Sequence, residues 1–401
     1  MKTRENVVVI GGSFAGRRVE RLLRHDFTVT LIDAKGFWEY HPAAARALVE
    51  PSSASRIVQP QPKRMTIATV ESIEPPKDGR AVQGRDHAST MRLSTGECLE
   101  FDYCVICTGS AYVAPIKSDQ TTAITAEDRR KQYADANLEL SAAKSVVVVG
   151  GGFVGVELAA EIAGRWGSKK KVTLLTSHPT LLERMHKDVG VAAEKWLVSK
   201  GVHLVFNQRV DAAKSSSHEV VTESGLSIKA DLVYSCMGFK PNALPLRQHY
   251  PGALTEHGGV KVNEFLQVEG LHNVFAVGDC TATLEEKNAL AADLGASLAV
   301  INIRALASKR DMALFPQGVC HGRSTVPTIA CVSLYKWSGV MQFNGLVLSG
   351  FVPALVKALI EYLQLSTASE CAIQTGAWDI IERVNIFLGR YLFVPRNLEL
   401  E

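Results

Sequence analysis

One pattern occurs twice in this chain and constrains its fold more than any other feature. A run of β-branched residues ends in a glycine-rich turn and is followed by a helical period, first at residues 7–16 (VVVIGGSFAG) and again at residues 146–155 (VVVVGGGFVG). Uninterrupted Val and Ile runs are typical of parallel strands buried on both faces. A further strand follows each helix, at residues 28–32 and 172–175. We therefore predict two βαβ units of the dinucleotide-binding type.

Composition narrows the class of protein. Hydrophobic residues make up 46% and charged residues 21% of the 401 positions, which is typical of a globular chain and excludes a disordered one. A net charge of +3 gives no electrostatic argument for nucleic acid. Eight cysteines are too few for a disulfide scaffold, so we expect a reducing, cytoplasmic location without a signal segment. The most apolar stretch, residues 346–363, is interrupted by Pro353, Lys357 and Glu361 and predicts a helix rather than a membrane span.

The second glycine loop predicts a site for a pyridine dinucleotide. Glycines let the backbone approach a pyrophosphate, and the helix that follows presents free N–H groups. The predicted contacts are Gly150, Gly152, Phe153, Val154, Gly155 and Thr176. Thr176 stands where an acid would contact a ribose, so NADH and NADPH both remain open. Lys169, Lys170, Lys171 and Arg184 could favour a 2′-phosphate, although a solvated turn is the alternative for the lysines.

The first glycine loop predicts a site for FAD. Its middle glycine is replaced by a small serine, and an aspartate at the end of the next strand can accept hydrogen bonds from ribose hydroxyls. A turn-capping role is the alternative for that aspartate. The predicted contacts are Gly11, Gly12, Ser13, Phe14, Ala15, Gly16, Asp33, Ala34 and Lys35.

A third glycine-terminated strand and two connecting segments suggest a family. Residues 274–279 (VFAVGD), the linker at 101–110 and the return at 237–242 resemble the two-dinucleotide-domain flavin reductases. The resemblance implies an α/β fold of two Rossmann-like domains, the second inserted in the first, with a C-terminal α+β element. It also implies that the FAD-binding domain comprises residues 1–110 and 237–314, the NAD(P)H-binding domain 111–236 and the C-terminal domain 315–401. Further cofactor contacts implied in this way are Thr108, Gly109, Gly238, Gly278 and Asp279.

Other residues indicate a branch of that family. The segment at residues 37–42 with Arg46, a predicted cofactor contact, resembles the flavin-covering loop of the apoptosis-inducing-factor-2-like, ferroptosis-suppressor-type branch. The same branch is suggested by Glu157 and by the short segments 339–343 and 349–357. Cys104 and Cys107 are three apart on a strand and face opposite sides of it, so we predict core residues rather than a redox pair. Type II NADH dehydrogenases are related, but their glutamines are missing from residues 287–293.

The resemblance implies an FAD-dependent NAD(P)H:quinone oxidoreductase. A type II NADH dehydrogenase and a flavin-based redox-sensing protein are the alternatives. Glu157 is expected near the nicotinamide, with pairing to the helix dipole as the alternative, and Lys287 near reduced flavin, with an exposed helix-start lysine as the alternative. No metal is expected, since Cys320 and His321 have no second pair at ligand spacing. The apolar stripe at residues 376–393 fits a peripheral membrane contact, a homodimer contact or a cover over the FAD domain.

Overall fold

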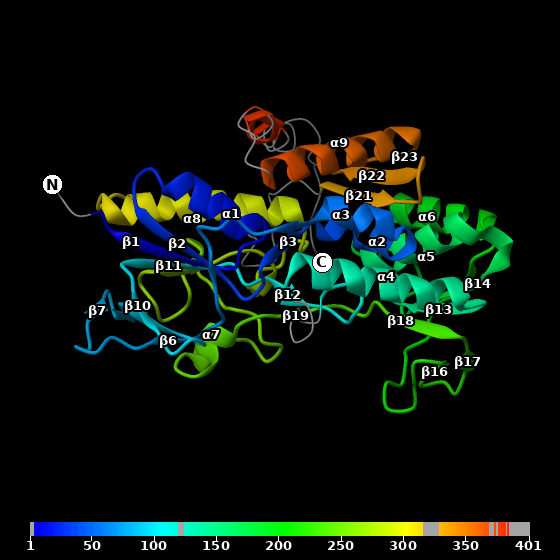
Figure 1. Cartoon of the computed structure of the whole chain (residues 1–401), viewed down its shortest axis with the longest axis horizontal. Coiled ribbons are helices and arrows are strands. Elements are labelled where there is room, and N and C mark those ends of the chain that lie inside the picture. Colours follow the sequence, from blue (N-terminus) through cyan, green and yellow to red (C-terminus); the bar gives the residue numbers. More distant parts are fainter. Residues whose placement is uncertain are drawn as a thin grey trace.

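The computed structural model describes residues 4–118, 124–315, 329–368, 373, 376–381 and 383–384. Two parallel sheets lie side by side along the long axis of the molecule (Figure 1). A third, antiparallel sheet with its own helix covers the part that contains the second parallel sheet (Figure 1). This arrangement confirms the predicted class, two Rossmann-like domains with a C-terminal α+β element.

The first sheet has five strands and is completed by a strand from late in the chain. Its order is β20-β11-β1-β2-β5, and every pairing is parallel. The chain leaves this sheet after β11 and returns in β20, which confirms the insertion. The strands are β1 (Asn6–Ile10), β2 (Thr28–Asp33), β5 (Thr66–Ile67), β11 (Tyr103–Ile106) and β20 (Val274–Ala276).

Helices and a small sheet bury the two faces of this first sheet. On one face, α1 (Phe14–Leu23) packs against α8 (Ala289–Ala307). The other face packs on a second cluster of buried apolar residues that includes the three-stranded sheet β6 (Val70–Glu74), β9 (Thr90–Leu93) and β10 (Cys98–Glu100). Smaller elements nearby are β7 (Ala81–Val82), β8 (Arg85–Asp86) and α7 (Leu244–Arg247). Burial on both faces explains why β1 contains only apolar residues after Asn6.

The second sheet repeats the same design with four parallel strands. Its order is β15-β14-β13-β18, formed by β13 (Ser145–Val149), β14 (Lys171–Leu175), β15 (His203–Val205) and β18 (Leu232–Ser235). Helix α5 (Phe153–Trp166) follows the glycine loop, and α6 (Lys187–Ser199) packs beside it. Helix α6 buries Val189, Gly190, Ala193 and Leu197. The hairpin of β16 (Glu219–Val221) and β17 (Ser227–Lys229) projects from this domain (Figure 1).

Two sets of elements connect the domains. The linker and the return pair as β12 (Ser110–Ala111) and β19 (Lys240–Pro241). The long helix α4 (Ala126–Ala142) packs on α2 (Ala44–Val49), α3 (Ala54–Ile57), β3 (Phe37–Glu39) and β4 (Val58–Pro60). Apolar residues from β3 and α2 share one buried cluster with α5. The domains therefore have a common core at this junction.

The C-terminal layer consists of β21 (Ile329–Ser333), β22 (Gly339–Phe343), β23 (Leu346–Gly350) and α9 (Phe351–Ala368). The strands form an antiparallel meander that contacts α5 and α6. The helix predicted from residue 346 is wrong in its first five residues, which form β23. The φ of +105° at Gly350 ends the strand, and α9 begins at the next residue.

Among the described residues, one helix is long and apolar enough to cross a membrane by length and composition, namely α8. Over half of its apolar window is buried against other parts of the protein, which is the usual position of a core helix.

Candidate functional site

The first glycine loop is packed tightly against the strand next to it. Gly11 has a φ of +108°, and a Cβ there would lie 2.2 Å from the carbonyl oxygen of Cys107. Directly beside the loop, Asp33 ends β2 and accepts hydrogen bonds from the N–H of Gly12 at 2.6 Å and of Lys35 at 2.8 Å. Its carboxylate is thus fixed at the corner where a dinucleotide ribose binds in this fold.

The second glycine loop combines tight packing with an open position. A Cβ at Gly155 would lie 1.9 Å from the carbonyl oxygen of Gly150, whereas a Cβ at Gly152 would meet no atom within 4 Å. Gly152 also precedes the first turn of α5, which contains no acidic residue. This combination of open space, free N–H groups and a positive helix end fits a pyrophosphate.

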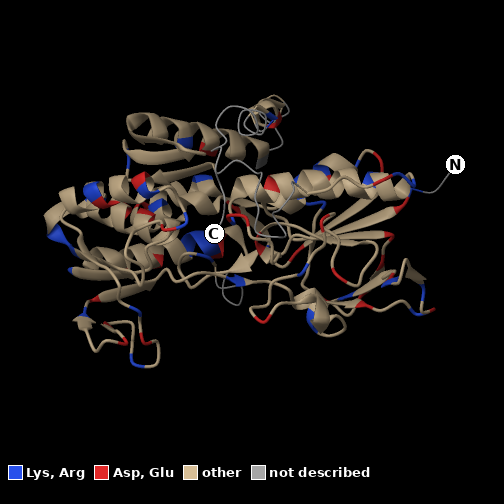
Figure 2. Cartoon of the chain, turned by 180° about the vertical axis from the view of Figure 1, so that it is seen from behind, with Lys and Arg blue, Asp and Glu red and all other residues tan. Residues whose placement is uncertain are grey.

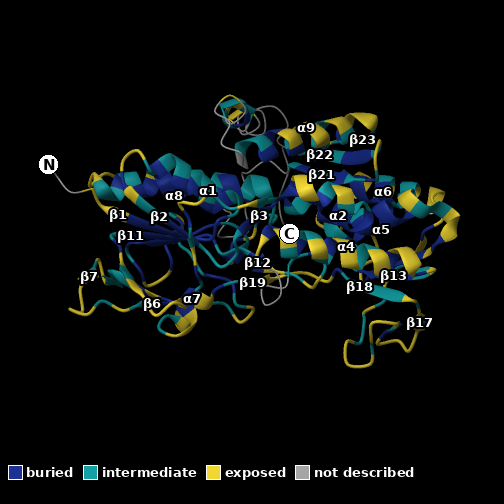
Figure 3. Ribbon diagram, viewed as in Figure 1, coloured by how far each residue is buried: buried dark blue, intermediate teal, exposed yellow. Residues whose placement is uncertain are grey.

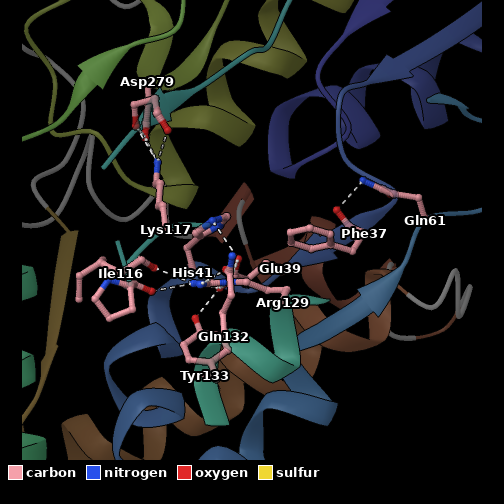
Figure 4. A network of polar contacts seen from close by, with 12 residues as sticks. Phe37, Glu39, His41, Gln61, Ile116, Lys117, Arg129, Gln132, Tyr133 and Asp279 are labelled. Atoms are coloured by element: carbon pink, nitrogen blue, oxygen red, sulfur yellow. Dashed lines mark hydrogen bonds and ion pairs between the residues drawn. The ribbon is translucent and has the colours of Figure 1, made fainter. Parts of the chain in front are cut away.

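The third glycine motif places Asp279 just after the end of β20 in the first sheet. Asp279 lies in a short 3-10 turn after β20 and accepts a hydrogen bond from Ser110 Oγ at 2.8 Å. Lys117 Nζ lies 3.6 Å from the same carboxylate and donates to Ser110 Oγ at 2.7 Å (Figure 4). Burial lowers the pKa of Lys117, and Asp279 acts in the opposite direction. Sequence reasoning missed Lys117, which lies in an irregular linker where no motif marks it.

A buried ion pair holds that linker in place. Glu39 of β3 and Arg129 of α4 are fully buried and lie 2.9 Å apart, and Arg129 also donates to the carbonyl oxygens of Pro115 and Ile116 (Figure 4). Tyr133 donates to Glu39 as well. Burial alone would raise the pKa of Glu39, but its neighbours outweigh that effect and lower it to about 2. The pair therefore positions the residue just before Lys117.

His41 completes this polar group. Its Nε2 lies 3.5 Å from Glu39, and burial lowers its pKa to about 3 although Glu39 favours the charged form. The imidazole is neutral at pH 7. Its neighbour Tyr40 is buried close to Phe14 and Trp38, so this loop forms an aromatic wall beside the first helix.

The linker and the return are joined where the sequence predicted cofactor contacts. Thr108 donates from its hydroxyl to the carbonyl oxygen of Asn242, and the N–H of Asn242 donates to Gly109 at 3.0 Å. Gly238 adopts a φ of +71° at an exposed turn. The crossover between the domains thus lies directly beside Asp279, which accepts a hydrogen bond from Ser110 of β12.

Glu157 joins the second domain to the C-terminal layer. It lies in the second turn of α5, beyond the reach of the helix dipole, and accepts from the N–H of Ser333 at 2.8 Å. Lys357 of α9 donates to the same carboxylate oxygen. Both side chains are largely buried, with 12% of Glu157 and 16% of Lys357 exposed. The C-terminal layer therefore contributes a cation to the predicted nicotinamide side.

Arg46 and Lys287, two predicted site residues, are bound to protein groups. Arg46 donates to Glu161 at 2.7 Å and to the carbonyl oxygen of Tyr335 at 2.9 Å. Burial raises the pKa of Glu161, and Arg46 offsets part of this. Lys287 Nζ donates to Thr281 at 3.0 Å, to Thr283 at 2.8 Å and to Glu285 at 3.2 Å. Thus Lys117, not Lys287, has its ammonium beside Asp279.

The three lysines of residues 169–171 lie at the wrong end of β14 to bind a 2′-phosphate. Lys171 begins β14 and Thr176 follows its end, so the run is one strand length away from the ribose corner. Lys170 is buried and donates to the carbonyl oxygens of Ser141 and Ala143.

The cysteines match the core prediction. Cys104 and Cys107 are buried in different apolar clusters on opposite faces of the first sheet. No group of three metal-ligating side chains occurs within the described ranges. Cys320 and His321 lie outside the described residues.

Two dinucleotide cradles that share a core and meet at one crossover define a class of protein, the flavin-dependent pyridine nucleotide oxidoreductases. The sequence profile of the pyridine nucleotide-disulphide oxidoreductases matches residues 5–322, and the chain belongs to this family. It is an FAD-dependent NAD(P)H oxidoreductase.

Relatives confirm the expected branch. The chain is 29% identical to apoptosis-inducing factor homolog B of Dictyostelium discoideum, over 88% of this chain and 94% of the relative. It is 30% identical to ferroptosis suppressor protein 1 of Mus musculus, over 88% and 92% respectively. Among solved structures, the sulfide:quinone oxidoreductase of Aquifex aeolicus shares the fold, with a TM-score of 0.75, 20% identity and 98% of each chain covered.

Proposed function

We propose that the physiological acceptor is a quinone and that the protein is an NAD(P)H:quinone oxidoreductase. In the net reaction, NAD(P)H, one proton and a quinone give NAD(P)⁺ and a quinol. FAD, when bound, supplies the electron chemistry, since it accepts a hydride and passes on two electrons. The Glu157–Lys357 pair is the observation that carries the proposal, because a quinone needs protons as well as electrons.

The chain's own residues have separable tasks in this proposal. Gly11, Gly12 and Asp33 bind the adenosine half of FAD, and Asp279 binds its ribityl chain next to Lys117. Glu157 orients the nicotinamide end of NAD(P)H and accepts a hydrogen bond from the ammonium of Lys357. Lys357 then delivers a proton to the oxygen of the acceptor, as a positioned general acid does.

The thiols argue for an acceptor outside the chain. The six cysteines within the described ranges are all free, and four of them are buried. Burial raises the pKa of Cys104, Cys107, Cys236 and Cys280, which keeps these thiols protonated and unreactive. These residues therefore offer no internal disulfide for the electrons.

The surface of the C-terminal layer suits a lipid-soluble acceptor. Helix α9 exposes residues along its length (Figure 3), and they form an apolar face. The exposed indole of Trp337 stacks on Phe351 at the start of this helix. The exposed residues of this face are Phe351, Val352, Leu355, Leu359 and Tyr362. We propose that this face makes the peripheral membrane contact of a protein that is otherwise cytoplasmic, with a homodimer contact as the alternative use. Charged residues of both signs are scattered over the described chain (Figure 2), which suggests no nucleic-acid surface.

The stripe at residues 376–393 does not carry the membrane proposal by itself. Trp378 is buried and donates to Asp293 of α8 at 3.2 Å. Asp379 pairs with Arg18 at 3.0 Å and Arg21 at 3.2 Å on α1. This part of the stripe covers the FAD domain, and residues 385–393 lie outside the described residues. Co-sedimentation with liposomes, before and after deletion of 376–401, separates the two surfaces.

Anaerobic stopped-flow mixing tests the function directly. The yellow protein is first reduced with NADH or NADPH and then mixed with a soluble short-chain quinone or an aromatic disulfide. We expect rapid reoxidation by the quinone and slow reoxidation by the disulfide. Flavin reduction without reoxidation by any acceptor would instead favour a redox-sensing protein.

A further inference from the structure

We propose that this enzyme prefers NADH to NADPH and that Glu183 sets the preference. The proposal rests on the function above and concerns the same nucleotide site. It starts from an absence in the sequence: Thr176, at the end of β14, gives the ribose corner no carboxylate. Glu183, seven residues further along the chain, brings a carboxylate to this corner.

The loop that carries Glu183 is fastened to the second glycine loop. The N–H of Leu182 donates to the carbonyl oxygen of Gly151 at 2.9 Å. Leu181 packs so closely that a Cβ at Gly151 would lie 3.2 Å from its side chain. Leu182 is held at a φ of +52°, an unusual conformation for a leucine. Glu183 therefore follows directly after a residue bonded to the loop that receives the pyrophosphate.

The carboxylate of Glu183 also faces the end of the strand. Its Oε2 lies 2.5 Å from Nδ1 of His178, and the N–H of His178 donates to Thr176 Oγ1 at 3.3 Å. Thr176 is buried against Gly151, so it closes the floor of this corner. About half of the Glu183 side chain is exposed, at 48%, which leaves it accessible to a nucleotide. Thr176, the imidazole of His178 and the carboxylate of Glu183 thus line the place where the ribose 2′-hydroxyl lies in this fold.

The lysines of residues 169–171 and Arg184 do not offset the acid. The three lysines of residues 169–171 lie at the opposite end of β14. Arg184, the next residue, pairs with Glu286 at 2.7 Å, on the side of the FAD domain. A 2′-phosphate would therefore bring two negative charges to Glu183, whereas a 2′-hydroxyl could donate a hydrogen bond to it.

The preference can be measured without hydride transfer. Calorimetric titration of the FAD-loaded protein compares ADP-ribose with 2′-phospho-ADP-ribose, which differ only in the phosphate. We expect ADP-ribose to bind about tenfold more tightly, the size expected for like charges a few ångström apart at a half-exposed site. Glu183→Gln should bring the two affinities within about twofold of each other, and Glu183→Arg should reverse their order. The ratio of kcat/KM for NADH and NADPH should follow the same series.

A matched control and the contrary outcomes make the test decisive. Glu223→Gln removes an acid from the exposed turn of the projecting hairpin and should leave the ratio unchanged. Equal binding of both compounds by the unaltered protein, or an unchanged ratio in Glu183→Gln, would overturn the inference. A clear preference for ADP-ribose in a protein that transfers no electrons to quinones would support the inference and refute the proposed function.

Discussion

The ammonium of Lys117 and the carboxylate of Asp279 lie 3.6 Å apart and share the hydroxyl of Ser110. They lie on opposite sides of the inserted domain, since Lys117 belongs to the linker where that domain begins and Asp279 follows the return from it. The buried Glu39–Arg129 pair anchors the carbonyl groups just before Lys117. One chain of contacts therefore connects the domain junction to the proposed flavin contact Asp279.

This relationship predicts how tightly FAD is held. Asp279→Asn removes the negative charge that we propose accepts hydrogen bonds from the ribityl chain, and Lys117→Met removes the cation while leaving Asp279 in place. We expect each change to weaken FAD binding by about tenfold, which is the effect of one charge-assisted hydrogen bond. Titration of the apoprotein with FAD, followed by flavin fluorescence, measures this. Lys77→Met, at an exposed position, is the control. Equal FAD affinity in Lys117→Met and the unaltered protein would show that Lys117 plays no part in binding.

The glycines of the second loop predict two different defects. Gly152→Val adds a side chain into open space, so the protein should fold and stay yellow while its KM for NADH rises at least tenfold. Gly155→Ala places a Cβ against the carbonyl oxygen of Gly150 and should lower the free energy of unfolding by about 2 kcal/mol or more. Urea unfolding and steady-state kinetics of both variants separate the effects. A normal KM in Gly152→Val would mean that the nucleotide binds elsewhere.

Local patterns in the sequence predicted much of the fold. The strands before both glycine loops were predictable, because buried parallel strands and tight glycine turns leave direct marks on residue types. The insertion was implied by the resemblance of the linker and the return to a known family. The core positions of Cys104 and Cys107 followed from the two-residue period of a strand.

The contacts between distant segments were not predictable in the same way. Lys357 meets Glu157 across 200 residues, and Lys117 meets Asp279 across the inserted domain. Each is a common surface residue type in an unremarkable local sequence. Their roles arise only when the domains pack.

The buried ion pair predicts a large loss of stability when one partner is removed. Arg129→Met leaves Glu39 charged and buried without its main partner, which typically costs about 3–5 kcal/mol. Urea unfolding of the FAD-loaded protein measures this. Lys131→Met breaks an exposed pair with Asp135 on the same helix and should cost less than about 1 kcal/mol. Similar losses in both variants would contradict the importance of burial.

Acid should destabilise the protein in two overlapping ranges. The pKa of His41 falls from its ordinary 6.5 to about 3 on folding, so only the unfolded chain takes up that proton between these values. Stability contributed by neutral His41 is therefore lost as the pH falls from about 6.5 toward 3. The pKa of Glu39 falls from 4.5 to about 2, so its contribution is present above 4.5 and lost below. Unfolding free energies measured from pH 8 to pH 4 should decline more steeply than those of His41→Asn. Parallel curves would contradict this assignment.

The Glu157–Lys357 pair predicts a defect in one half of the catalytic cycle. If Lys357 delivers a proton to the acceptor, Lys357→Met should slow reoxidation by a quinone about 100-fold, the usual contribution of a positioned general acid. Reoxidation by ferricyanide, which takes electrons without protons, should change little. Glu157→Gln should affect flavin reduction by NADH as well, because we propose that the same carboxylate orients the nicotinamide. Lys336 lies in the same layer as Lys357 and pairs at the surface with Glu50, which follows α2. Lys336→Met breaks this pair and serves as the control. If Lys357→Met slowed ferricyanide and quinone equally, the lysine would act on the flavin rather than on proton delivery.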